Sequence, residues 1–123
     1  MRGWNRWVIL GLIALACGCA RHGAGTEPTP YRDRLTAAGD IADRQARDQA
    51  MKEIAVDAAA APDVVAVREA LRDISSREVH DEAAEGAAVR LKQSEQSRAA
   101  LEVASTMANG PKRDQAMREL SER

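Results

Sequence analysis

Apolar residues recur at spacings of three and four along most of this chain, with polar residues between them. Two consecutive series show this spacing most clearly: Val64, Val67, Leu71 and Ile74, then Val79, Ala83, Ala87 and Leu91. Such spacing places the apolar residues on one face of an α-helix. No stretch of useful length alternates β-branched with polar residues, so strands are not expected. The pattern therefore predicts an all-α protein.

Proline, glycine and capping residues divide this pattern into separate helices. The first pair is expected at residues 31–40 and 43–61. Pro62 and Asp63 suit the first turn of the next helix, and the one after it is expected to start near Ser76 or Val79. A further helix carries Ala100, Leu101, Ala104 and Met107. Asn109-Gly110-Pro111 then predicts a break before the last helix.

One segment of the chain occurs twice with few changes. Residues 47–54 read RDQAMKEI and residues 113–120 read RDQAMREL, an offset of 66. A weaker copy, HDEAAEGA, lies halfway at residues 80–87, which predicts stacked units with a 33-residue period. In this register Asp43, Ser76 and Asn109 align, and all three are good N-cap residues. Three aspartates also align near the first turn, where the helix dipole favours an anion: Asp48, Asp81 and Asp114.

The repeated pattern is similar to the signature of HEAT repeats, in which an Asp and a Val-Arg pair open the second helix of each unit. The matching residues run D43-x-x-A46-R47-x-x-A50-x-x-x-I54, with further copies at 76–83 and 109–120. The resemblance implies a short stack of antiparallel helix pairs, about two and a half copies, over residues 31–123. It also implies a hydrogen-bonded ladder between neighbouring units through Asp43, Arg47 and Arg113. The second copy has Ser76 and His80 at the ladder positions.

Two other helical arrangements remain open at this point. Ala, Glu, Arg and Gln are strong helix formers, so a non-repeating bundle of helical hairpins would show similar patterns by chance. A long coiled coil is less favoured because Pro62 and Pro111 interrupt the helices.

The N-terminal segment has the organisation of an export signal. Arg2 and Arg6 precede a run of apolar residues that ends in Leu15-Ala16-Cys17-Gly18-Cys19. The run is shorter than the roughly twenty residues needed to cross a bilayer, although an uncleaved anchor stays open as an alternative. The segment resembles the signal peptide of bacterial lipoproteins, in which small residues precede a cysteine that becomes lipidated.

This resemblance implies a covalent lipid anchor and a location. Cys19 is the favoured lipidation site because Gly18 precedes it, and Cys17 is the alternative. Diacylglycerol on the thiol and a fatty acyl group on the new N-terminus are implied, and together they would hold the chain firmly on a membrane. Ala20 is not the Asp associated with inner-membrane retention. The expected location is the cell envelope, with the outer membrane facing the periplasm favoured over the inner membrane.

The rest of the chain divides into a tether and one domain. We expect a signal peptide at 1–18, a lipidated tether rich in Gly, Thr and Pro at 19–30, and a helical domain at 31–123. Without Arg2 and Arg6, 16 of the 18 basic residues remain against 19 acidic ones, a formal charge near −3. Nucleic-acid binding is therefore not expected. After Trp7 the only aromatic residue is Tyr31, which predicts a thin aliphatic core.

Catalytic chemistry finds little support in the sequence. His80 is the only histidine of the helical part, and as a general base it would need a partner and a cleft. Glu78, His80 and Asp81 have unconvincing spacing for a metal site, and His22 lies alone in the tether. No phosphate-binding glycine loop or nucleophile elbow occurs. The sequence predicts neither an enzyme nor a cofactor.

Two classes of function are then compatible with the chain. The first is a membrane-anchored protein-interaction module, because stacked helices expose a continuous surface that binds partners. Its partner would be an unidentified envelope protein, and self-association is possible in principle. The second is a structural tether of the envelope without specific ligand recognition. A signal-anchored or secreted helical domain is the remaining alternative.

Overall fold

The computed structural model describes residues 30–122, and these form six helices and no strands. The helices are α1 (Arg32–Gly39), α2 (Arg44–Ala60), α3 (Val64–Arg72), α4 (Arg77–Gln93), α5 (Ser97–Ser105) and α6 (Gly110–Ser121). The prediction of an all-α protein is confirmed. The predicted segments also match the observed helices to within a few residues, except that Asp63 is the N-cap of α3 and Pro62 precedes it.

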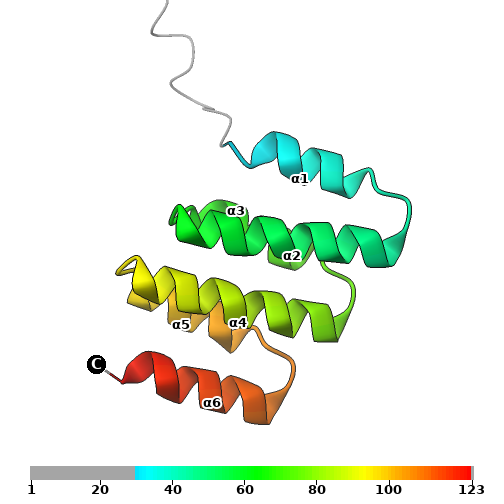
Figure 1. Cartoon of the computed structure of the whole chain (residues 1–123). Coiled ribbons are helices and arrows are strands. Elements are labelled where there is room, and N and C mark those ends of the chain that lie inside the picture. The colour runs from blue at the N-terminus through cyan, green and yellow to red at the C-terminus, as the bar shows by residue number, and fades with distance from the viewer. Residues whose placement is uncertain (1–29, 123) are drawn as a thin grey trace, which may run out of the picture.

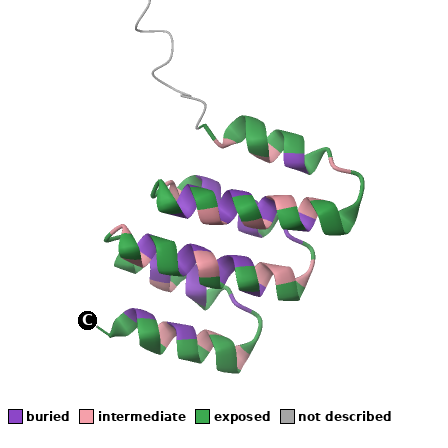
Figure 2. Cartoon of the chain, in the orientation of Figure 1, coloured by how far each residue is buried: buried purple, intermediate pink, exposed green. Residues whose placement is uncertain are grey.

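The helices are stacked in layers, with α1 and α6 at opposite ends (Figure 1). The long helices α2 and α4 lie side by side, and α6 follows α4. The short helix α3 packs on α2, and α5 packs on α4, so each long helix is paired with the short helix that follows it in the chain. Figure 2 shows that burial is concentrated in α2 to α5, between the two ends of the stack.

Side-chain caps begin four of the six helices. Asp43, Asp63, Ser76 and Asn109 each accept a hydrogen bond from the backbone N–H three residues later. Such a bond satisfies one of the N–H groups that have no partner within a helix. The expected caps Asp43, Ser76 and Asn109 are therefore confirmed, and the caps explain why the long helices begin where they do.

The core consists of small aliphatic side chains. More than half of the buried apolar residues are alanines, and Met51, Val67, Leu91 and Met107 are the largest that are fully buried. Alanine allows close approach of helix backbones, and α2 and α4 pack closely in this way. A Cβ added at Gly86 on α4 would lie 3.2 Å from Cγ2 of Val56 on α2. This packing makes α2 and α4 the rigid centre of the stack.

Candidate functional site

Several residues singled out by the sequence lie outside the described part of the chain. Cys17, Cys19 and His22 belong to residues 1–29. The lipidation site, the signal peptide and nearly all of the tether therefore stay predictions. Within residues 30–122, no helix has the length and apolar character needed to cross a membrane.

Two buried aspartates link successive layers of the stack. Asp48 on α2 accepts hydrogen bonds from the backbone N–H groups of Ser75 and Ser76 at 3.0 and 2.9 Å, directly before α4. Asp81 on α4 accepts the same pair of bonds from Ala108 and Asn109 at 2.7 and 2.9 Å, directly before α6. Both aspartates directly follow the first turn of their helices, close to where they were expected, but their hydrogen bonds go to another part of the chain. Each instead anchors the start of the next long helix.

The residues expected to form a ladder have other surroundings. Asp43 caps its own helix. Arg113 lies beside Asp114, with 3.7 Å between Nε and Oδ1. No hydrogen bond or ion pair of the Arg47 side chain occurs among the described residues. A ladder through these residues stays a prediction, and the links that the structure contains come from Asp48 and Asp81.

His80 is half-buried on α4 and lies next to one of these links. Its Nδ1 is 3.6 Å from Oδ1 of Asp81, so these sequence neighbours do meet, although adjacent positions on a helix usually point apart. Burial by itself would raise the pKa of the Asp81 carboxyl, but the N–H groups of Ala108 and Asn109, together with His80, bring it below its usual value. No cluster of three or more His, Cys, Asp or Glu side chains suited to a metal ion occurs in residues 30–122.

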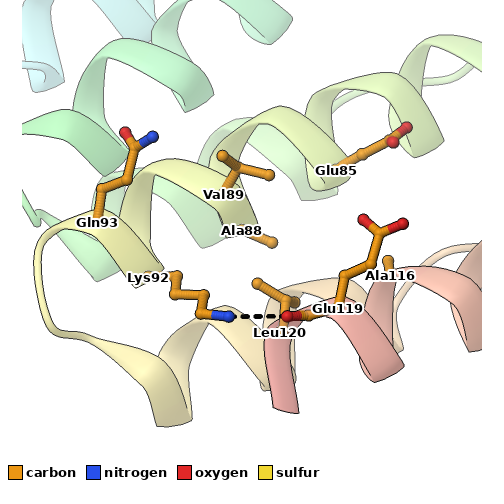
Figure 3. Close-up of a pocket in the computed structure, with 8 residues that line it drawn as sticks. All are labelled: Glu85, Ala88, Val89, Lys92, Gln93, Ala116, Glu119 and Leu120. Atoms are coloured by element: carbon orange, nitrogen blue, oxygen red, sulfur yellow. Dashed lines mark hydrogen bonds between the residues drawn. The ribbon is translucent and has the colours of Figure 1, made fainter. Parts of the chain in front are cut away.

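An apolar hollow lies between α4 and α6, with a volume of about 450 Å³ (Figure 3). Ala88 and Val89 line it on α4, and Ala116 and Leu120 line it on α6. Val89 is 47% exposed, one of two large apolar side chains that face solvent to this degree in the described chain. We call this hollow the α4–α6 groove.

The groove opens because larger side chains replace small ones. The gap between α2 and α4 is closed by residues that include Ala59, Gly86 and Ala87, of which both alanines are fully buried. Moving 33 residues along the chain from these three positions gives Lys92, Glu119 and Leu120. Helices can approach closely only where their facing side chains are small, so the larger side chains at these three positions fit the wider separation of α6 from α4. The sequence therefore accounts for a closed gap between α2 and α4 and an open one between α4 and α6.

Lys92 closes the end of the groove that lies near the C-terminus of α6. Its Nζ donates a hydrogen bond to the backbone carbonyl of Glu119 at 2.7 Å (Figure 3). It donates a second one to the backbone carbonyl of Glu122 at 2.8 Å. The last carbonyls of a helix have no partner within the helix, and a lysine is a favourable partner for them because of the helix dipole. Lys92 thus fixes the C-terminal end of α6 at a distance from α4.

Two carboxylates border the groove, and neither forms an ion pair with Lys92, the cation that also lines it. Glu85 on α4 and Glu119 on α6 lie on its opposite walls (Figure 3). The Glu119 carboxylate accepts a hydrogen bond from Nε2 of Gln115 at 2.9 Å. No ion pair of either glutamate occurs among the described residues. The groove therefore combines an apolar floor with a rim on which two unpaired carboxylates outnumber one lysine.

The sequence reasoning did not identify this groove. A signal for it is present, because the 33-residue register shows Lys, Glu and Leu at positions where the preceding unit has Ala, Gly and Ala. Comparison with protein-family models, curated proteins and solved structures finds no match to this chain. The site is therefore interpreted from its own geometry.

Proposed function

We propose that this chain is an exported envelope lipoprotein whose helical domain acts as a small protein-interaction module. The N-terminal sequence supports the anchor, with Cys19 as the lipidated residue and Cys17 as the alternative. The HEAT-like pattern supports a stack of helix pairs that presents partner-binding surfaces. The outer membrane, facing the periplasm, is the proposed location.

The observation that carries the interaction function is the α4–α6 groove. Grooves between two helices are a common way to bind an amphipathic segment of another protein. The exposed Val89 and the partly open floor leave apolar surface that a partner could cover. A purely structural tether has no need of such a surface, so the groove favours interaction over passive tethering.

Intact mass measurement tests the anchor. The protein is recovered from membranes of its native host, and a mass that matches a chain starting at Cys19 or Cys17 plus acyl groups supports the proposal. A Cys19→Ser variant should lose the acyl mass, whereas Cys17→Ser should keep it. An unmodified mass would leave a signal-anchored or secreted helical domain.

Site-specific photo-crosslinking in the native envelope tests the interaction. A photoreactive amino acid at Val89 is expected to give one discrete crosslinked protein. Val65 on α3 provides the matched control, since it is a valine with 60% exposure that does not line the groove. Equal crosslinking from both positions, or none from Val89, would favour the structural tether.

A further inference from the structure

We infer that the occupant of the α4–α6 groove is a cationic amphipathic helix of a partner protein, which places aliphatic side chains on the groove floor and a lysine or arginine between Glu85 and Glu119. This inference rests on the proposed interaction function and adds the chemistry of the ligand.

The shape of the groove selects a helix with small or medium aliphatic side chains. Its lining residues on α4 are Glu85, Ala88, Val89, Lys92 and Gln93, at spacings of three, one, three and one. Those on α6 recur in the same way from Ala116 to Leu120. The row on α4 runs for about two turns and the row on α6 for a little over one. Two apolar rows on neighbouring helices are the pattern of helix-in-groove recognition. The hollow of about 450 Å³ has room for one or two aliphatic side chains and is not lined by any aromatic residue.

Comparison with the α2–α4 gap indicates that the α4–α6 groove lacks a positive charge beside its glutamates. Between α2 and α4, Nζ of Lys52 pairs with Oε2 of Glu82 at 2.5 Å and so ties the two helices together. The positions 33 residues further along are Glu85 and Gln115, and this pair has no cation. Gln115 donates instead to Glu119. At these two register positions the α4–α6 gap has one carboxylate and one neutral amide where the α2–α4 gap has a balanced pair, and Glu119 adds a second carboxylate at the position that corresponds to Gly86.

The nearby lysine does not supply this charge. Lys92 donates to two backbone carbonyls at the end of α6 and makes no ion pair with Glu85 or Glu119 in the described structure. A cation from the partner would then meet two carboxylates beside an apolar floor, where reduced contact with water strengthens the attraction. A partner helix with an acidic face would be repelled.

Peptide titration of the full-length chain tests the inference. The probe is a short alanine-based helical peptide with two leucines and one arginine on one face. Its binding is measured by the fluorescence anisotropy of a label on the peptide. Two matched peptides carry glutamine in place of the arginine, or alanines in place of the leucines. We expect the Leu–Arg peptide to bind at least fivefold more tightly than either of the others, and salt to weaken its binding most.

Protein variants then assign the effect to the groove. The double variant Glu85→Gln/Glu119→Gln should reduce affinity for the Leu–Arg peptide at least fivefold and leave affinity for the Leu–Gln peptide unchanged. Val89→Glu should place a charge on the apolar floor and weaken the binding of both peptides. Glu53→Gln is the control, because Glu53 is an exposed α2 residue that does not line the groove, and it should bind as the wild type does.

Three results would overturn the inference. The first is equal affinity for the arginine and glutamine peptides. The second is an affinity for the Leu–Arg peptide that the double variant Glu85→Gln/Glu119→Gln does not change. The third is self-association of the chain without peptide that Val89→Glu abolishes. The last would identify a second copy of the chain as the occupant. Failure of the proposed interaction function is distinguished by the crosslinking at Val89. A crosslinked partner without charge preference refutes only the cationic helix.

Discussion

Asp81 and Asn109 are joined by a hydrogen bond in which Oδ2 of the buried carboxylate accepts the Asn109 backbone N–H at 2.9 Å. Asn109 in turn caps α6 with its own side chain, which accepts from the N–H of Lys112 at 3.1 Å. Asp48 and Ser76 have the same relationship one layer earlier. Each aspartate thus fixes the capping residue of the next long helix, and this link determines where one layer begins relative to the last.

Removing either link should destabilise the fold. Hydrogen bonds to a charged group contribute more than neutral ones, so Asp48→Ala or Asp81→Ala should lower the free energy of unfolding by about 1–3 kcal/mol. Urea unfolding followed by far-UV circular dichroism measures this change. Asp114→Ala is the matched control, since Asp114 has the same register but a side chain that is 69% exposed. Equal losses in all three variants would contradict the role given to the buried pair.

Acid should weaken the Asp81 link. The folded state lowers the pKa of Asp81 below its ordinary value of 3.8 despite its burial, because the two N–H groups and His80 favour the ionised form. A carboxyl with a depressed pKa stabilises the fold above its ordinary pKa, and this stabilisation is lost as pH falls through the lowered value.

The free energy of unfolding should therefore decrease between roughly pH 5 and pH 2 in the wild type and less in Asp81→Asn. Glu82 contributes in the same direction, since its hydrogen bond and charge interaction with Lys52 lower its pKa at an exposed position. High salt should screen the Glu82 contribution more than that of Asp81. Parallel pH curves for the wild type and Asp81→Asn would refute this assignment.

The sequence was sufficient to predict the helical elements and their caps. Apolar spacing identified the helices, and Asp43, Ser76 and Asn109 were recognised as caps because short polar side chains can accept the first free N–H groups. The same register aligned Asp48 with Asp81. Their position near the helix starts was predicted, but the link that they make was not, because the partner N–H groups of Asp48 are 27 and 28 residues away.

The α4–α6 groove could not be predicted from the sequence for a related reason. Whether two helices touch depends on the summed size of facing side chains from distant parts of the chain. The exchange of Ala59, Gly86 and Ala87 for Lys92, Glu119 and Leu120 is visible in the register. Its consequence becomes evident only when the α2–α4 and α4–α6 gaps can be compared in space.

The turn between α4 and α5 contains a residue in an unfavourable backbone conformation. Glu95 has φ of 62°, the one positive value for a non-glycine residue in the described chain. The left-handed region costs L-residues about 1–2 kcal/mol, whereas glycine enters it freely but loses more entropy on folding. Glu95→Gly should therefore raise the free energy of unfolding by about 0.5–1 kcal/mol. Ser94→Gly, at φ of −90°, should lower it, and a loss in both variants would contradict the strain argument.

Lys92 should matter for stability through α6 alone. Lys92→Met keeps most of the aliphatic side chain and removes the donor to the two carbonyls of Glu119 and Glu122. The expected loss is about 0.5–1.5 kcal/mol, with faster amide hydrogen exchange confined to α6. Arg90→Met on the same helix is the control, because Arg90 is exposed and its side chain makes no hydrogen bond in the described structure. Faster exchange throughout α4 in Lys92→Met would mean that the lysine serves its own helix instead.

Close approach at Gly86 should be what keeps the α2–α4 gap shut. Gly86→Leu places a large side chain against Val56, whose Cγ2 already lies 3.2 Å from an added Cβ. Overpacking of this kind costs about 1–3 kcal/mol, which exceeds the roughly 1 kcal/mol that leucine gains over glycine in helix propensity. Glu85→Leu, one residue away at an exposed position, has no such clash and should change stability little. If Gly86→Leu were as stable as Glu85→Leu, side-chain size could not be the reason that one gap is closed and the other open, and the origin given for the groove would have to be abandoned.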